Sequence, residues 1–139
     1  MFHLDQFISQ YVTKRPVSMF SADIEANRDA LSKKIAGKSV LVIGGAGSIG
    51  SSFIKALLPF KPASLVVVDY NENALAELTR DLRSTKGMYV PEDYIPYPMD
   101  FASPVFEKMF RDGICQVSYR YYTKMVEFFD INYELLEVD

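Results

Sequence analysis

The chain has 139 residues, of which 49% are hydrophobic and 24% are charged. This composition is typical of one globular domain and excludes disordered and fibrous proteins. Fifteen Lys and Arg against eighteen Asp and Glu give a net charge of −3, and no basic run is present that would neutralise the phosphates of nucleic acid. No apolar stretch approaches the ~20 residues of a membrane helix, and no signal peptide is evident. We therefore expect a cytoplasmic protein that binds neither nucleic acid nor membranes.

Two residue types that build many catalytic and metal sites are almost absent. The chain has one cysteine, Cys115, and one histidine, His3. One cysteine forms neither an internal disulfide nor a CxxC metal site, and a Ser-His-Asp triad would depend on a histidine beside the terminus. We therefore predict no metal site and no such triad.

Residues 1–36 predict a helical leader. A first helix is expected over residues 4–13 and ends at Arg15-Pro16. In a second helix, Ser21 is the expected N-cap and Gly37 stands where a C-terminal cap belongs. The apolar faces of the two helices consist of Leu4, Phe7, Ile8 and Tyr11, and of Ile24, Leu31 and Ile35.

From residue 39 the hydrophobic pattern alternates between strands and helices. Residues 39–43 (SVLVI) and 64–68 are continuous apolar runs, typical of strands buried on both faces of a parallel sheet. A helix is expected between them over residues 49–58, ending at Pro59. The apolar positions of this helix are Ile49, Phe53, Ala56 and Leu57. Together these segments predict a βαβ unit.

The alternation continues to the end of the same region. Asn71 is the expected cap of a helix that ends near Gly87, and residues 94–99 predict a third strand. Ser103 and Pro104 then begin a helix. The apolar residues of the two helices are Leu75, Leu78 and Leu82, and Val105, Phe106, Met109 and Phe110.

Pro96 and Pro98 indicate where the third strand lies. Positions two residues apart in a strand direct their missing N–H groups to the same side, so both prolines fit an edge strand. In a 3-2-1 strand order the third strand is that edge. The order βαβαβα therefore predicts an α/β fold, a Rossmann-like doubly wound parallel sheet that is truncated to residues 37–112.

A glycine cluster, GGAGSIG, lies between the first strand and its helix. We expect Gly44 to allow the tight turn, Gly47 to let the backbone approach a pyrophosphate, and Gly50 to let the helix pack close to the strand. The free N–H groups and the helix dipole at Ser48, Ile49 and Gly50 would hold the phosphates. This spacing predicts dinucleotide binding.

Asp69 ends the second strand, nineteen residues after Gly50. This is close to the offset at which an acid accepts hydrogen bonds from the adenosine ribose. The alternative is a tight turn followed by a solvent-facing Asp with no ligand. Asp69 would repel a 2′-phosphate and so favours NAD over NADP, although Arg80, Arg83 and Lys86 lie within one helix and could reach back. We also assign Tyr70 and Asn71, which follow Asp69, to the cofactor site.

Asp100 and Phe101 follow the third strand at the same edge of the sheet. Ligands bind at this carboxyl edge in open α/β folds, so both residues are candidates for contact with the cofactor. An equally good alternative is a simple strand-end Asp that leads into the Ser103 cap.

These motifs resemble a known family. Gly44, Gly47 and Gly50 form the GxxGxxG fingerprint of the extended short-chain dehydrogenase/reductases. Over about residues 13–111, the segments GKSVLVIGGAGSIGSSFIKALL and LVVVDYNENALAELTRDLRS are similar to the nucleotide-sugar 4,6-dehydratases of bacterial polysaccharide synthesis, typified by UDP-N-acetylglucosamine 4,6-dehydratase. The resemblance implies that Asp100 and Phe101 contact adenine and that Ser48 and Ile49 lie against the pyrophosphate.

The catalytic half of that family has no counterpart here. Its members are more than twice as long and carry a Tyr-x-x-x-Lys helix, an Asp-Lys acid/base pair and a sugar-binding lobe. No lysine of this chain has a tyrosine four residues earlier, and Tyr121 and Lys124 are only three apart. We therefore assign no catalytic residue, and we expect a UDP-sugar substrate only for a full-length parent. The alternative functions are a non-catalytic dinucleotide-binding module and a fragment of another Rossmann oxidoreductase or epimerase.

Residues 113–139 form an aromatic tail in which the resemblance is lost. The tail predicts an amphipathic helix, followed by an extended segment over residues 133–138. The apolar positions of the helix are Ile114, Val117, Tyr121, Met125, Phe128 and Phe129. Three origins stay open: an excised cofactor half, a shortened relative, or a product that has lost its middle. Because a three-stranded sheet leaves its first strand without a neighbour on one side, we also expect a homo-oligomer.

Overall fold

The computed structural model describes residues 7–14 and 17–112. The predicted tail, with Cys115, Tyr121 and Lys124, lies outside the described residues, as does His3. Contacts divide the chain into two units, Met1–Lys33 and Lys34–Asp139, which are described separately below.

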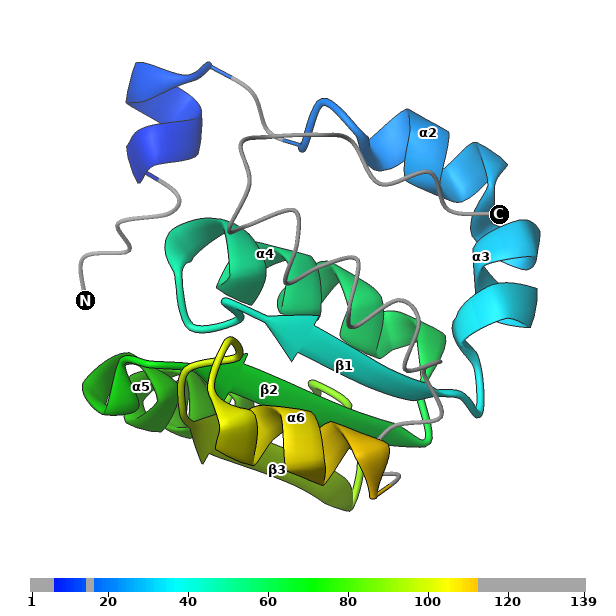
Figure 1. Cartoon of the computed structure of the whole chain (residues 1–139). Helices are drawn as coiled ribbons and strands as arrows, with labels where there is room; N and C mark the ends of the chain where they lie inside the picture. The colour runs from blue at the N-terminus through cyan, green and yellow to red at the C-terminus, as the bar shows by residue number, and fades with distance from the viewer. Residues whose placement is uncertain (1–6, 15–16, 113–139) are drawn as a thin grey trace, which may run out of the picture. The chain divides into compact units, whose positions relative to one another are not determined.

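The first unit contains short helices (Figure 1). A π-helical turn, η1 (Ile8–Val12), stands where the first helix was expected, and α2 (Ser21–Ala26) and the start of α3 (Arg28–Ile35) follow. The prediction that Ser21 is an N-cap is wrong, because Ser21 is the first helical residue and Phe20 occupies the cap position without a side-chain hydrogen bond. The expected single helix is interrupted at Asn27, whose side-chain amide donates to the carbonyl of Asp23 at 2.8 Å.

The two apolar faces predicted for the leader differ in burial. Phe7, Ile8 and Tyr11 are exposed. Ile24, Leu31 and Ile35 are half-buried, and Ile35 packs against the core of the sheet, although neither α2 nor α3 contains a fully buried residue. Leu4 and Arg15-Pro16 lie outside the described residues.

The second unit is built on a parallel sheet of three strands, β1 (Ser39–Ile43), β2 (Ser64–Asp69) and β3 (Asp93–Pro98). The strand order is β1-β2-β3, which confirms the predicted truncated Rossmann-like sheet with the third strand at an edge. Val67 pairs with Pro96 and Asp69 with Pro98, so both prolines lie on this edge strand. Every residue of the central strand β2 is buried.

Helices cover both faces of the sheet (Figure 1). On one face, α4 (Ser48–Leu57) and α5 (Glu72–Ser84) pack on Val42, Leu65 and Val67. On the other face, α6 (Pro104–Arg111) packs Phe106 and Phe110 on Val66 and Val68. The residues of β2 alternate between these two clusters, as the pleat of a strand requires. The short 3-10 helix η2 (Leu58–Phe60) connects α4 to the second strand.

The predicted apolar face of α4 is wrong at three of its four positions. Ile49 is 85% exposed, Phe53 is 53% exposed and Ala56 is exposed, whereas Ile54 and Leu57 are buried. The spacing of the apolar residues alone is compatible with two rotations of α4 about its axis. Gly50 decides between them because it lies directly against the backbone of Gly44 and Gly45, and residues four and seven positions later then face the sheet.

Side-chain caps begin the two later helices. The side chain of Asn71 accepts a hydrogen bond from the amide of Ala74 at 3.0 Å, and that of Ser103 accepts one from the amide of Phe106 at 3.2 Å. Both predicted caps are confirmed. The prediction that Val105 belongs to the apolar face of α6 is wrong, because Val105 is 67% exposed.

Candidate functional site

The carboxyl ends of the three strands meet at one pocket of about 210 Å³. This is the edge at which open α/β sheets bind ligands. The pocket brings together five of the ten residues predicted to bind a cofactor, namely Gly44, Asp69, Tyr70, Asp100 and Phe101. Its other walls are apolar and come from Ile43, Val68 and Met99. None of these three was predicted from the sequence, although each is adjacent along the chain to a predicted residue: Ile43 ends β1, Val68 is the penultimate residue of β2, and Met99 follows β3.

The glycine loop connects β1 to α4 and contains glycines that the fold requires. Gly44 has φ +70°, a conformation that side chains disfavour, which fits the predicted tight turn. A Cβ at Gly50 would overlap the carbonyl oxygen of Gly44 and lie 2.7 Å from the Cα of Gly45. A Cβ at Gly45 would overlap the side chain of Val67. The need for glycine at Gly45 was not foreseen, because it arises from contact with a strand more than twenty residues away.

Gly47 differs from the other glycines of the loop. Its φ of −69° and ψ of 169° are open to any residue, and a Cβ there would meet nothing closer than the carbonyl oxygen of Gly44 at 3.6 Å. Neither backbone conformation nor packing within the described residues therefore requires glycine at this position. The space beside Gly47 is open to a ligand.

The N-terminus of α4 has no side-chain cap. Gly47 occupies the cap position and lacks a side chain, whereas α5 and α6 are capped by Asn71 and Ser103. The first N–H groups of a helix have no partners within the helix, so those at Ser48, Ile49 and Gly50 are available to an anion.

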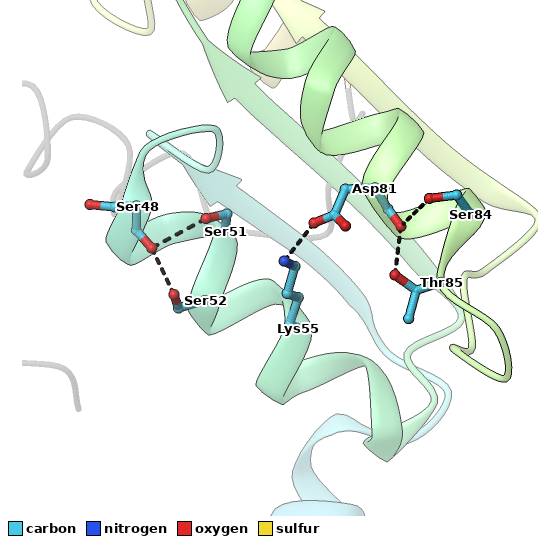
Figure 2. A network of polar contacts seen from close by, with 7 residues as sticks. All are labelled: Ser48, Ser51, Ser52, Lys55, Asp81, Ser84 and Thr85. Atoms are coloured by element: carbon cyan, nitrogen blue, oxygen red, sulfur yellow. Dashed lines mark hydrogen bonds and ion pairs between the residues drawn. The ribbon is translucent and has the colours of Figure 1, made fainter. Parts of the chain in front are cut away.

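The serines of this first helical turn differ in orientation (Figure 2). The hydroxyls of Ser51 and Ser52 donate to the carbonyl oxygen of Ser48, at 3.2 and 2.8 Å, and the hydroxyl of Ser48 points away from both. On the flank that faces α5, Lys55 forms an ion pair with Asp81. Among the described residues, the hydroxyl of Ser48 has no hydrogen-bond partner, so this uncapped turn offers one serine hydroxyl to a ligand.

Asp69 is not the solvent-facing side chain of the alternative interpretation, because it is only 9% exposed. Its Oδ2 accepts a hydrogen bond from the amide of Ala46 at 3.1 Å, and its Oδ1 accepts one from the amide of Asn71 at 3.0 Å. The carboxylate therefore lies between the glycine loop and the cap of α5. The side-chain oxygen of Asn71 is used for that cap.

Asp100 forms hydrogen bonds within the turn that precedes α6 and also lines the pocket. Its Oδ1 accepts a hydrogen bond from the amide of Ala102 at 2.9 Å, and its carbonyl oxygen accepts one from the hydroxyl of Ser103 at 2.7 Å. The two interpretations of this residue are therefore compatible.

The basic residues considered for a 2′-phosphate lie along or beyond α5, away from the pocket. Arg80 is eight residues into this helix, about 12 Å from its first residue at 1.5 Å per residue. Its guanidinium pairs with Glu77 at 3.0 Å. Arg83 and Lys86 are farther along the chain. None of the three lines the pocket at the carboxyl ends of the strands.

Comparison with known proteins gives matches over part of the chain. Residues 40–94 match a family model described as "Polysaccharide biosynthesis protein". The probable polysaccharide biosynthesis protein EpsC of Bacillus subtilis is 29% identical over 77 residues, and the capsular polysaccharide biosynthesis protein CapD of Staphylococcus aureus is 26% identical over 77 residues. This part of the chain resembles polysaccharide biosynthesis proteins. The family match includes the glycine loop and Asp69, and ends before Asp100.

Each match covers a larger share of this chain than of the relative. Each of these two alignments covers 55% of this chain and 12% of the relative. An uncharacterized membrane protein, MJ1061, of Methanocaldococcus jannaschii is 51% identical over 49 residues, which cover 35% of this chain and 15% of the relative. The chain therefore matches less than a sixth of the length of each of these curated relatives.

No helix among the described residues is long and apolar enough to cross a membrane. Within residues 7–14 and 17–112, no cluster of three His, Cys, Asp or Glu side chains is arranged to hold a metal ion.

Proposed function

We propose that this chain binds a dinucleotide at the carboxyl edge of its sheet, as the NAD(P)-binding portion of a nucleotide-sugar 4,6-dehydratase in polysaccharide biosynthesis. The observation that carries the proposal is the loop at Gly47, where the fold does not require glycine but a bound pyrophosphate would. The matches to polysaccharide biosynthesis proteins, which include this loop and Asp69, support the biological role.

The residues of the site suit the parts of such a cofactor. The N–H groups at Ser48, Ile49 and Gly50 and the hydroxyl of Ser48 would bind the pyrophosphate. Asp69 would accept hydrogen bonds from the ribose, and the apolar walls of the pocket beside Phe101 would receive adenine. In a full-length parent, the cofactor held by these residues would supply hydride transfer for the oxidation at C4 of the sugar and the reduction at C6, and the acid/base residues for the loss of water across C5 and C6 would come from outside this chain.

The site favours NAD over NADP in this proposal. A 2′-phosphate next to the ribose would bring its negative charge close to Asp69. The nearest candidates for compensation, Arg80 and Arg83, lie along α5 and away from the pocket.

Replacement of Gly47 by Ala tests the proposal. The variant should fold with unchanged stability, since its Cβ meets only an ordinary contact at 3.6 Å, but it should bind NAD at least about tenfold more weakly because the methyl group occupies the pyrophosphate space. Calorimetry measures the affinity, and urea denaturation measures the stability.

Gly87→Ala is the matched control for the same chemical change. Gly87 has φ +80° and lies away from the pocket, so this variant should lose about 1 kcal/mol of stability and keep its affinity for NAD. Equal NAD affinity of wild type and Gly47→Ala would contradict the proposed site.

The second candidate function is a dinucleotide-binding module without chemistry. It is favoured by the sequence itself, in which no lysine follows a tyrosine by four residues. Incubation of the protein with NAD and UDP-N-acetylglucosamine distinguishes between catalysis and binding. We expect NAD to bind and no 4-keto-6-deoxy sugar to accumulate, and accumulation of that product would show that this chain contains catalytic residues after all.

A further inference from the structure

The carboxylate of Asp69 joins two parts of the proposed site. Ala46, whose amide donates to Oδ2, lies in the glycine loop twenty-three residues before Asp69. Asn71, whose amide donates to Oδ1, begins the connection to α5. Both hydrogen bonds are made by backbone amides to a side chain that is 9% exposed. Asp69 therefore has structural partners before any ligand is bound.

Few other hydrogen bonds hold the middle of the loop. The amide of Gly44 donates to the carbonyl of Val68 at 2.8 Å and anchors the start of the loop, but the amide of Gly47 reaches the carbonyl of Gly44 only at 3.4 Å. Among the described residues, Asp69 is the one side chain that forms a hydrogen bond with the segment from Gly44 to Gly47. The amide at the middle of the loop, that of Ala46, is therefore bound by this carboxylate.

The carboxylate of Asp69 can accept further hydrogen bonds from a ligand. Each oxygen of an ionised carboxylate accepts two hydrogen bonds, and the two amides use one site on each oxygen. The remaining sites suffice for the two hydroxyls of a ribose. Hydrogen bonds to an ionised acceptor are also stronger than those between neutral groups.

We propose that Asp69 is a positioning residue for the phosphate-binding loop as well as a ribose acceptor, so that a single carboxylate couples the ribose and phosphate subsites. The inference rests on the proposed dinucleotide site. It predicts that loss of the carboxylate weakens the binding of phosphate groups that Asp69 never touches.

Inorganic pyrophosphate separates this role from ribose binding, since it carries no ribose. If Asp69 only binds ribose, Asp69→Asn should bind pyrophosphate as well as wild type does, or more tightly because one negative charge has been removed. If Asp69 positions the loop, the variant should bind pyrophosphate about tenfold more weakly despite the lost charge, because an asparagine accepts through only one oxygen. Only the positioning role therefore predicts weaker binding of pyrophosphate by Asp69→Asn. Calorimetry with pyrophosphate tests this role, and calorimetry with adenosine tests ribose binding.

Asp93→Asn is the matched control. Asp93 is an exposed residue that begins β3, at the end of the strand opposite the pocket, and this variant loses the same charge. Its pyrophosphate affinity should stay unchanged. A loss in Asp93→Asn equal to that in Asp69→Asn would overturn the positioning role.

Amide measurements on the ligand-free protein test the coupling independently of nucleotide binding. Hydrogen exchange at the Ala46 amide should be faster in Asp69→Asn than in wild type. Exchange at the Ala46 amide that is equally slow in wild type and in a folded Asp69→Asn variant would overturn the inference. Failure of wild type to bind NAD would instead overturn the proposed function.

Discussion

At the scale of single residues, the glycine loop contains positions of two kinds. Gly50 is required by the fold, because its Cα lies against the backbone of Gly44 and Gly45. Gly47 has no such neighbour, and the site proposed above gives it a role in ligand binding. The GxxGxxG spacing identifies both positions equally, but only the contacts of the backbone distinguish them.

Replacement of Gly50 by Ala should destabilise the protein. The added Cβ would overlap the carbonyl oxygen of Gly44, which is backbone and cannot rotate away, so α4 would have to move from β1. We expect a loss of about 1 to 3 kcal/mol in the free energy of unfolding, the range observed for overpacking. Urea denaturation measures this loss, and Gly47→Ala serves as the control in the same loop. Equal stability of the two variants would contradict the packing role of Gly50.

At the scale of elements, α6 forms the second helical layer by itself within the described residues. Ser103 caps its first turn, and Phe106 and Phe110 lie one turn apart against the face of the sheet that carries Val66 and Val68. Phe106 is fully buried. The helix therefore depends on a small number of large contacts.

Truncation of Phe106 tests this dependence. Phe106→Ala should lower the free energy of unfolding by about 3 to 5 kcal/mol, because the lost ring leaves a cavity in a packed layer. The adjacent Val105 is 67% exposed, and Val105→Ala should change the stability by no more than about 0.5 kcal/mol. Chemical denaturation of both variants measures the difference. A similar loss in the two would contradict the orientation of α6.

At the scale of the whole molecule, β1 has a strand neighbour on only one side within the described sheet. An apolar surface lies on the neighbouring helix α4, where Ile49 and Phe53 are exposed. Phe53 is two residues from Lys55, about 200° around the helix, so it lies on the flank opposite the one that faces Asp81 of α5. Unpaired strand edges and exposed apolar surfaces both favour association.

The expected homo-oligomer follows from this surface and stays a prediction. Wild-type protein should give a mass above that of the monomer in light scattering at tens of micromolar, and Phe53→Lys should shift the mass towards the monomer. Val105→Lys, which alters an exposed apolar residue of α6, is the control and should leave the mass unchanged. A monomer mass for wild type would rule out the predicted association.

The sequence by itself determined the features that depend on neighbouring residues. The strand at residues 39–43, the caps at Asn71 and Ser103 and the edge position of the strand with Pro96 and Pro98 agree with the structure. Each of these rests on a continuous apolar run, a contact three residues along the chain, or a missing N–H group. Each of these signals lies within a short segment of the sequence, so it can be recognised without knowledge of the fold.

Only the tertiary structure decided which side of α4 is buried and what Asp69 binds. Helical spacing allowed Ile49 and Phe53 to face the sheet, but the contact of Gly50 with Gly44 and Gly45 turned them outward. The hydrogen bond from Ala46 to Asp69 joins residues twenty-three positions apart and uses a backbone amide, which every residue except proline carries. No side-chain pattern marks such a contact, because it exists only once β1 and β2 lie side by side in register.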